Sequence, residues 1–355
     1  MNKKIYTVLD ANLNRSLEGL RVCEDSLRFV FNSSLSFSLR LKKIRHNLLK
    51  VSEKLPQKDL LLNRRVEEDK QKFIDLATEK KRKDLFEVLK TNLHRVMESL
   101  RSLEEFVKVI NQNLSSSIEK IRFSLYALEQ DIFIFFSKEK QLALLEKNLY
   151  AIIDSTFVKN NNYLEVAKQM TAGGAKIIQL RMKKESRKKI KEVAQDLSSW
   201  CRQKRVLFFL NDYPDLALLT KAHGVHIGQE DLSVLEVRKI ISKEMLIGCS
   251  THSVAEVWQA DQEGADYISF GPLYNTKSKT GKMLKGIGEQ EVPLIREKIK
   301  RPLVAIGGLT EDKVKGLLDL GFNSLAVISQ LYKNDKIKDN TKRFLELIKG
   351  ERVDR

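Results

Sequence analysis

Eight short apolar runs, separated by segments of helix length, constrain the fold of this chain more than any other feature. They read LYAIID, AKIIQLR, VLFFLND, GVHIG, LIGCST, YISFGP, LVAIGG and SLAVIS, and all lie after Asn148. Each is followed by a segment with helical periodicity, which is the pattern of consecutive βα units in a parallel sheet. Eight such units predict an α/β fold, a closed (β/α)8 TIM barrel over residues 141–355. An open doubly wound sheet is the alternative, but it rarely needs eight evenly spaced units.

Residues 1–140 show only helical periodicity, and they repeat internally. LDANLNRSLEGLRVCEDSLRF from Leu9 aligns without gaps to LKTNLHRVMESLRSLEEFVKV from Leu89, and KIRHNLL from Lys43 loosely resembles KIRFSLY from Lys120. A repeat of this kind predicts a duplicated helical hairpin. The barrel is therefore expected to be preceded by an all-α helical domain.

Each copy of the repeat carries an apolar stripe at helical spacing that is interrupted by one acid, Glu24 or Glu104. Arg21 and Arg101 flank these acids one turn earlier. A buried acid is costly unless it is paired, so an Arg–Glu pair that fixes the helix register is one interpretation. The other is a second, pseudo-symmetric polar site built from Asn12, Arg21, Glu24 and their copies. The stripe residues are Leu9, Leu13, Leu17, Leu20 and Leu27, with Leu89, Leu93, Met97, Leu100 and Val107 in the second copy.

Charge and composition narrow the class of protein. The net charge of +17 is spread over both halves, with lysines interleaved with acids, as in LATEKKRKDLFE. Such patterning favours solvated helix faces or an anionic small-molecule substrate over nucleic-acid binding. The chain has no apolar run of membrane-spanning length, and MNKKIYTVLDANLNRS lacks the apolar core of a signal peptide, so a cytoplasmic protein without membrane contact is expected. The three cysteines form no C-x-x-C pair, which supports neither a disulfide framework nor a zinc site.

Polar residues end the second, third and fourth apolar runs, where the mouth of a barrel lies. Gln179, Arg181 and Lys183 alternate in IIQLRMKK, so they share one face of an extended chain and could bind phosphate. An ordinary charged strand end would look the same. Asp212 and Asp231 follow the next two runs and could bind Mg²⁺, which takes carboxylate oxygens. Asp231 could instead cap the helix that follows it.

Segments that follow the later apolar runs could bind an anion. GPLYNTKSKTGK follows the sixth run and could surround an anion with backbone N–H groups, while Lys279 adds a point charge. Taken alone it is also a plausible surface loop. AIGGLTED and VISQ end the last two runs, where Gly307, Gly308 and Ser329 are candidates for a phosphate site. Glycine at a tight turn is the alternative.

Taken in their order along the chain, these motifs resemble those of the thiamine phosphate synthase family, also called thiamine-phosphate pyrophosphorylase. The resemblance spans residues 148–349 through GGAKIIQLRMK, FFLNDYPDLA, GVHIGQEDL, IGCSTHS, GADYISFGPLYNTKSK, AIGGLT and AVIS. It implies a transferase of thiamine biosynthesis. The reaction would condense 4-amino-2-methyl-5-hydroxymethylpyrimidine diphosphate with 4-methyl-5-(2-phosphoethyl)thiazole, giving thiamine phosphate and pyrophosphate.

The resemblance also implies roles for individual residues, with Lys279, Arg181 and Ser250 as catalytic groups. The pyrimidine diphosphate would be held by Gln179, Arg181, Lys183, Asn211 and Lys279, with Ser250 near the pyrimidine. Asp212 and Asp231 would hold Mg²⁺. The thiazole phosphate would be held by Thr276, Ser278, Gly308, Ile328 and Ser329. The implied chemistry is dissociative, and it needs no general base.

Two alternatives stay open at this point. Thiazole tautomerases share the fold and make no thiamine phosphate, but retention of Lys183, Asp212, Asp231 and Lys279 argues against them. The helical part resembles an extension fused to some of these synthases and linked to phosphorylation of the pyrimidine monophosphate, although it has no G-x-x-x-x-G-K-[ST] loop. It could be a separate pyrimidine phosphate kinase or a partner-binding module. The sequence leaves the oligomeric state open.

Overall fold

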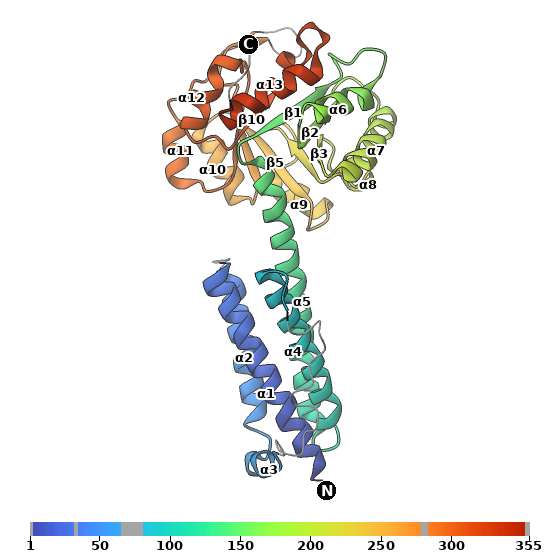
Figure 1. Cartoon of the computed structure of the whole chain (residues 1–355), viewed down its shortest axis with the longest axis vertical. Helices are drawn as coiled ribbons and strands as arrows, with labels where there is room; N and C mark the ends of the chain where they lie inside the picture. Colours follow the sequence, from blue (N-terminus) through green and yellow to red (C-terminus); the bar gives the residue numbers. More distant parts are fainter. Residues whose placement is uncertain (1–2, 32–34, 65–80, 278–282, 352–355) are drawn as a thin grey trace. The chain divides into compact units, whose positions relative to one another are not determined.

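A computed structural model describes residues 3–31, 35–64, 81–277 and 283–351. The chain divides into two compact units, Met1–Ile134 and Phe135–Arg355. Figure 1 shows a helical unit and a unit that contains the strands. The division falls inside the helix α5 (Gln112–Leu142), a few residues before position 140, where the sequence analysis places it.

The first unit is entirely helical in its described residues, as the sequence predicts. Its elements are α1 (Lys4–Asp25), the π-helical turn η1 (Ser26–Val30), α2 (Leu35–Ser52), α3 (Gln57–Leu62), α4 (Leu85–Val107) and most of α5. The two copies of the repeat are α1 and α4, which pack side by side and run in opposite directions. Cys23 contacts Leu89, whereas Gly19, earlier in α1, lies against Val96, later in α4. A Cβ at Gly19 would lie 2.6 Å from Val96 Cγ2, so glycine permits this close approach.

The predicted apolar stripes lie in the core of the helical unit. Every stripe residue is buried except Leu17, which is half-buried. The burial of both stripes agrees with the prediction that each is the core-facing side of its helix.

The two stripe acids are buried and paired, but only in part as predicted. Glu104 accepts hydrogen bonds from Arg101 (2.5 Å) and from Arg122 of α5 (2.8 Å). Glu24 accepts from Arg45 of α2, at 3.2 Å. The prediction that Arg21 pairs with Glu24 was wrong, because Arg21 bonds Asp25 on the exposed face of its own helix.

The loosely repeated KIR motifs supply the partners that the sequence analysis missed. Arg45 and Arg122 are the arginines of KIRHNLL and KIRFSLY, and each points from the next long helix to the acid of its own copy. Asn12 and Asn92 instead bond backbone carbonyl groups one turn earlier, at Val8 and Val88. The pairing interpretation accounts for the buried acids, and a second polar site in this unit stays a prediction.

Removing the charge of Glu104 should destabilise the helical unit more than the same change at Glu24. Arg122 is nearly buried, with 10% of its side chain exposed, and its hydrogen bond to Glu104 raises its pKa. Glu104→Gln would leave that cation without its counter-charge, which costs about 3 kcal/mol. Arg45 is 27% exposed and can be solvated. Calorimetry of the two full-length variants measures the difference, and equal losses would contradict the assignment.

The second unit is a closed barrel of eight parallel strands, in the order β1-β10-β9-β6-β5-β4-β3-β2. The strands are β1 (Asn148–Asp154), β2 (Ile177–Arg181), β3 (Leu207–Asn211), β4 (Gly224–Ile227), β5 (Leu246–Thr251), β6 (Tyr267–Phe270), β9 (Leu303–Ile306) and β10 (Ser324–Val327). Each lies in one of the eight predicted runs. Two short strands, β7 (Thr276–Lys277) and β8 (Met283–Leu284), form a separate antiparallel pair.

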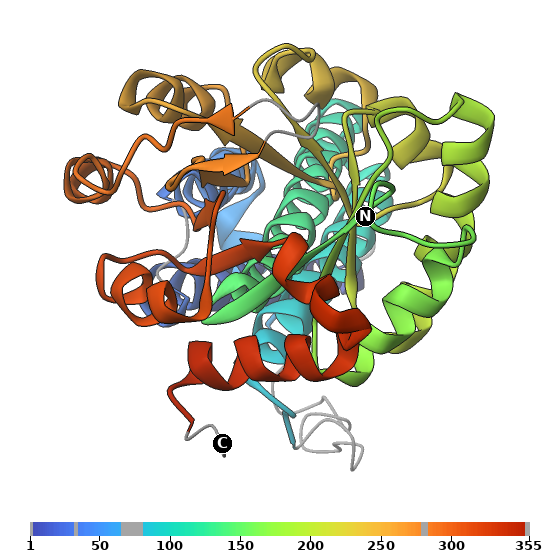
Figure 2. The same ribbon diagram turned by 90° about the horizontal axis from the view of Figure 1, so that it is seen from above.

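Helices surround the strands, as Figure 2 shows. They are α6 (Tyr163–Ala172), α7 (Arg187–Lys204), α8 (Pro214–Leu219), α9 (Val234–Ile240), α10 (Val254–Gln262), α11 (Val292–Lys298), α12 (Val314–Asp319) and α13 (Ile337–Lys349), with 3-10 turns η2 (Ala143–Leu145), η3 (Glu311–Lys313) and η4 (Ser329–Asp335). Alternation along the strands separates two cores. In β1, Leu149 and Ala151 face the helices, whereas Tyr150 and Ile152 fill the barrel interior.

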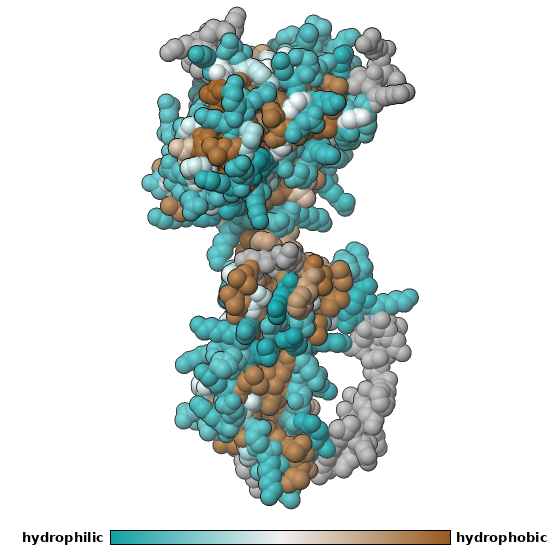
Figure 3. Space-filling view, turned by 90° about the vertical axis from the view of Figure 1, so that its left-hand side faces the viewer, coloured by the Kyte–Doolittle hydropathy of each residue, from teal (hydrophilic) through white to brown (hydrophobic). Residues whose placement is uncertain are grey.

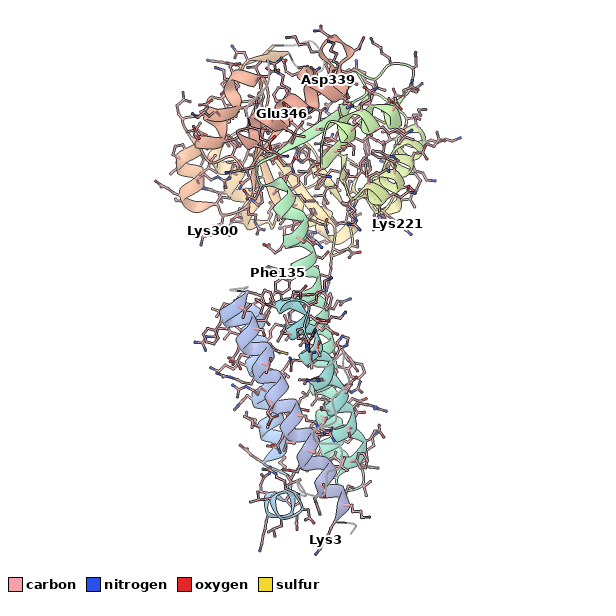
Figure 4. All side chains as sticks on the ribbon, in the orientation of Figure 1. Lys3, Phe135, Lys221, Lys300, Asp339 and Glu346 are labelled. Carbon is pink, nitrogen blue, oxygen red and sulfur yellow. The ribbon has the colours of Figure 1, made fainter. Side chains whose placement is uncertain are left out.

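The surface of the barrel unit is mostly hydrophilic on the face seen in Figure 3. Elsewhere on the barrel unit, the exposed Lys221 and Lys300 project outward, as Figure 4 shows. The interleaved charge pattern of the sequence predicts solvated lysines of this kind. Among the described residues, no helix is sufficiently long and apolar to cross a membrane.

The end of α5 belongs to the barrel rather than to the helical unit. Leu142 and Leu144 pack against the barrel interior together with the buried Leu145. One turn earlier, Lys138 donates to Asp266 at 3.1 Å, and Asp266 also accepts from Arg238 at 2.6 Å. The last turns of α5 therefore close the end of the barrel that is opposite to the mouth.

A fragment that begins at Phe135 should be more stable than one that begins at Gln141, although both keep all eight βα units. The shorter fragment loses Lys138 and its bond to the largely buried Asp266, about 2 kcal/mol for a hydrogen bond between charged groups. Urea unfolding of the two fragments tests this. Equal midpoints would show that the end of α5 adds nothing to the barrel.

Candidate active site

The ends of β1 and β2 place a buried ion pair at the mouth of the barrel. Asp154 and Arg181 are register partners, and Arg181 Nη1 donates to Asp154 Oδ2 at 2.9 Å. The other carboxylate oxygen accepts from the backbone N–H and the hydroxyl of Thr156, at 3.0 and 2.7 Å. Asp154 is thereby held in place, and it fixes the guanidinium of Arg181.

Arg181 remains a cation in this position. Burial lowers its pKa, but the carboxylates of Asp154 and Asp212 oppose the shift, and an arginine starts far above neutral pH. The bond to Asp154 uses one of several guanidinium N–H donors. Further donors are thus available for an anionic ligand.

An amide pair lies next to this cation. Gln179 of β2 donates from Nε2 to Oδ1 of Asn211, at the end of β3, at 2.5 Å. Both side chains are buried. Because Asn211 accepts this bond through its carbonyl oxygen, its amide N–H₂ keeps its capacity to donate to a ligand.

Asp212 follows β3 in a left-handed backbone conformation, with φ of +69°. Few residues other than glycine adopt it, and it is held here because the N–H of Asp212 donates to the carbonyl of His226 at 2.9 Å. The conformation turns the carboxylate toward Lys183, whose Nζ lies 2.9 Å from Oδ2. The structure thus brings together Lys183 and Asp212, which the sequence placed on neighbouring strand ends.

Asp231 accepts a hydrogen bond from the N–H of Gly228 at 2.7 Å. It does not cap the next helix, since Ser233 caps α9 in a capping box with Glu236. Burial raises the pKa of Asp231, as does the carboxyl group of Asp212 within hydrogen-bonding reach, whereas the Gly228 N–H and the charge of Lys183 lower it. Two acids therefore lie side by side and repel each other when both are ionised.

Asp212 and Asp231 could together hold a divalent cation such as Mg²⁺. Within the described ranges, no group of three or more His, Cys, Asp or Glu side chains could hold a metal ion. Two adjacent carboxylates suit an ion that completes its shell with water and substrate phosphate oxygens. A divalent cation there would also relieve the repulsion between the two acids.

Adding Mg²⁺ should therefore raise the melting temperature of the wild-type barrel. An ion at a hundred times its Kd stabilises the folded state by about 3 kcal/mol. Asp212→Asn and Asp231→Asn should each lose most of this gain, and Asp231→Asn should be more stable than wild type without Mg²⁺ because one buried charge is removed. Thermal unfolding with and without Mg²⁺ measures both effects. A full Mg²⁺ shift in the two variants would rule out this site.

The remaining predicted site residues lie at the ends of later strands. Ser250 is the penultimate residue of β5, and its hydroxyl lies 2.9 Å from His226 Nε2. Gly308 follows β9, while Ile328 and Ser329 follow β10. Thr276 lies in β7. Ser278 and Lys279 lie outside the described residues.

The loop after β6 packs against the end of β9. The N–H of Leu273 donates to the carbonyl of Ile306 at 2.9 Å, and the N–H of Tyr274 to that of Gly307 at 3.2 Å. Gly308 has φ of +67°, and a Cβ there would lie 2.8 Å from the Cβ of Tyr274. Glycine at this position therefore serves a tight turn, and it also lets the two loops predicted to bind the thiazole phosphate meet.

Three groups near the site were missed by the sequence analysis. Asp154 ends the run LYAIID, so its position at a strand end was a usable signal. Tyr150 and Tyr267 gave none, because aromatic residues in apolar runs look like ordinary core. His226 stands inside the apolar run GVHIG, which gave no sign that its ring nitrogens face Tyr267 and Ser250.

Comparisons with known proteins find similarity over both units of the chain. A family model described as thiamine monophosphate synthase matches residues 149–331, and one described as the ThiD2 family matches residues 7–131. A thiamine-phosphate synthase from Prochlorococcus marinus subsp. pastoris is 33% identical over 95% of this chain and 93% of its own length. Another, from Rhodopirellula baltica, is 31% identical over 99% of this chain and 94% of its own. The solved structure of a thiamine phosphate pyrophosphorylase from Pyrococcus furiosus is 30% identical, with a TM-score of 0.53, and covers 58% of this chain and 98% of its own.

Proposed function

Since the chain belongs to the thiamine monophosphate synthase family and is a transferase of thiamine biosynthesis, we propose which residues at the mouth of its barrel carry out the condensation. The substrates are 4-amino-2-methyl-5-hydroxymethylpyrimidine diphosphate and 4-methyl-5-(2-phosphoethyl)thiazole. The thiazole nitrogen forms a bond to the pyrimidine methylene carbon, the carbon–oxygen bond to the diphosphate breaks, and pyrophosphate leaves with the bonding electrons.

The convergence of Arg181, Lys183, Asp212 and Asp231 carries this proposal. Two cations and two carboxylates from neighbouring strand ends lie within one set of contacts, as a site for a metal diphosphate requires. When bound, Mg²⁺ supplies a Lewis acid that neutralises charge on the departing pyrophosphate. The chain's own residues do the rest.

Each residue has a task that follows from its contacts. Arg181, held by Asp154, donates to the diphosphate and stabilises the negative charge that grows as the bond breaks. In the structure Lys183 pairs with Asp212, and it would be free to turn to the phosphate oxygens if a cation took its place at that carboxylate. Asn211, oriented by Gln179, donates its amide N–H₂ to the pyrimidine diphosphate. None of these steps needs a proton to be removed from substrate.

The second substrate is assigned to the later strand ends. Thr276, Ser278, Gly308, Ile328 and Ser329 hold the thiazole phosphate, and Lys279 reaches the diphosphate as a further catalytic cation. Ser250 contacts the pyrimidine. The proposal includes reaction in the cytoplasm on small phosphorylated molecules, without nucleic acid or membrane.

An assay for thiamine phosphate formed from the two precursors with Mg²⁺ tests the function. Arg181→Ala and Lys279→Ala should each slow turnover by about a hundredfold, the usual loss for one charge contact to a transition state. Lys300→Ala is the matched control and should keep full activity, because this exposed lysine lies just before the start of β9, at the end of the barrel opposite the mouth. No thiamine phosphate from the wild-type chain would refute the proposed reaction, and active Arg181→Ala and Lys279→Ala variants would refute the proposed roles.

A further inference from the structure

A row of buried polar side chains lies inside the barrel and ends at Ser250. The hydroxyls of Tyr150 and Tyr267 are 2.6 Å apart, Tyr267 Oη is 3.0 Å from His226 Nδ1, and His226 Nε2 is 2.9 Å from Ser250 Oγ. Both tyrosines and the histidine are buried, whereas Ser250 is half-buried. The row thus joins the barrel interior to a residue at the mouth.

The strand register and one glycine hold this row together. His226 of β4 pairs in register with Gly248 of β5, which pairs with Tyr267 of β6. A Cβ at Gly248 would lie 2.6 Å from His226 Nδ1 and would overlap the hydroxyl of Tyr267. Only glycine between the two strands lets the phenol and the imidazole meet. The contact therefore depends on the absence of a side chain at Gly248 as well as on Tyr267 and His226.

The direction of the hydrogen bonds follows from the far end of the row. Burial raises the pKa of both tyrosines, so both hydroxyls keep their protons. Among the described residues, the Tyr150 hydroxyl has Tyr267 as its one hydrogen-bond partner. It must donate to Tyr267, because a buried donor without an acceptor is costly. Tyr267 then donates its own proton onward, to Nδ1 of His226.

This direction decides the tautomer of the histidine. A neutral imidazole whose Nδ1 accepts carries its proton on Nε2, which then donates to Ser250 Oγ. With its oxygen accepting from His226, the hydroxyl of Ser250 has its proton to give. In the reverse direction Ser250 would donate to His226, and the Tyr150 proton would have no acceptor.

We propose that Tyr150, Tyr267 and His226 are positioning residues that fix Ser250 as a hydrogen-bond donor toward the bound substrate. The matching group on the substrate is an acceptor with a lone pair, such as a ring nitrogen of the pyrimidine. The identity of that substrate rests on the proposed function, whereas the direction of the row rests on its geometry alone.

Packing alone would not need the hydroxyls. The rings of Tyr150 and Tyr267 lie 5.7 and 5.3 Å from the ring of Phe209, measured between centroids, and phenylalanine would fill the same space. Tyrosine-to-phenylalanine changes therefore separate the two roles, because they remove the donors and keep the rings.

The first experiment reads the tautomer in the unmodified full-length protein. The chain has five histidines, so ¹⁵N-histidine labelling gives few signals, and His226 is recognised by its contacts with the Tyr267 ring. The proposal expects a proton on Nε2 and a bare Nδ1. A proton on Nδ1 would overturn it, whatever the activity of the protein.

The second experiment asks whether Tyr267 acts through Ser250. Tyr267→Phe should lower kcat/KM for the pyrimidine diphosphate by about tenfold, the scale of one hydrogen bond, and leave the KM for the thiazole phosphate unchanged. Ser250→Ala should lose at least as much, and the double variant should be no slower than Ser250→Ala. Losses that multiply, or an unaffected Tyr267→Phe, would overturn the proposal.

The outcomes distinguish this proposal from the proposed function. A wild-type chain that makes no thiamine phosphate fails the function, and the tautomer still decides the direction of the row. If Ser250→Ala retains full activity, the donor role of Ser250 is overturned while the synthase reaction stands. Tyr150→Phe adds an independent check, because removing the terminal donor should allow both His226 tautomers to appear.

Discussion

The side-by-side carboxylates of Asp212 and Asp231 are the constraint on which the mouth of this barrel depends. Two adjacent acids repel each other when both are ionised, and a nearby cation relieves that repulsion. Lys183 supplies one charge directly, and a bound Mg²⁺ would supply two more. The left-handed backbone at Asp212 belongs to the same arrangement, because it brings the carboxylate to Lys183 and is held by a bond to the next strand.

Around this pair, the barrel sorts its polar groups by depth. Asp154 is fully buried and bonded through both oxygens, so it fixes Arg181. Deeper in the barrel, Tyr150, Tyr267 and His226 set the direction of the hydrogen bonds that end at Ser250, and they do not place a charge there. In both places a group that cannot reach substrate orients one that can. Buried networks of this kind hold a single geometry only when each member is satisfied.

The helical unit likewise pairs its buried charged groups with hydrogen-bonding partners. The duplicated helices α1 and α4 cover each other, and each leaves one acid inside the apolar stripe. An arginine from the following helix neutralises it in both copies, which explains how a charge can recur inside a core. The copies are not identical, because Glu104 has a second arginine, Arg101, whereas Arg21 bonds Asp25.

The sequence by itself determined the two-part architecture, the eight βα units and the strand ends where the site would form. Period and spacing are local properties that can be read from the sequence. When eight parallel strands close into a barrel, their carboxyl ends meet at one mouth whatever the side-chain contacts are. It also identified both stripe acids and the two carboxylates of the mouth. The family resemblance added the reaction, and the comparisons confirmed it.

Only the tertiary structure decided which groups pair. Arg45 and Arg122 could not be chosen over Arg21 from periodicity, because a long side chain reaches partners on another helix that spacing does not reveal. From the sequence, Asp231 could bind a metal or cap the next helix, and only the structure shows that Ser233 and Glu236 form the capping box there. The Tyr150–Tyr267–His226 row joins side chains from three strands. The role of Gly248, which makes room for the contact between Tyr267 and His226, becomes visible only when β4, β5 and β6 lie side by side. Hydrogen bonds depend on positions in space, and the sequence specifies those positions only through the complete fold.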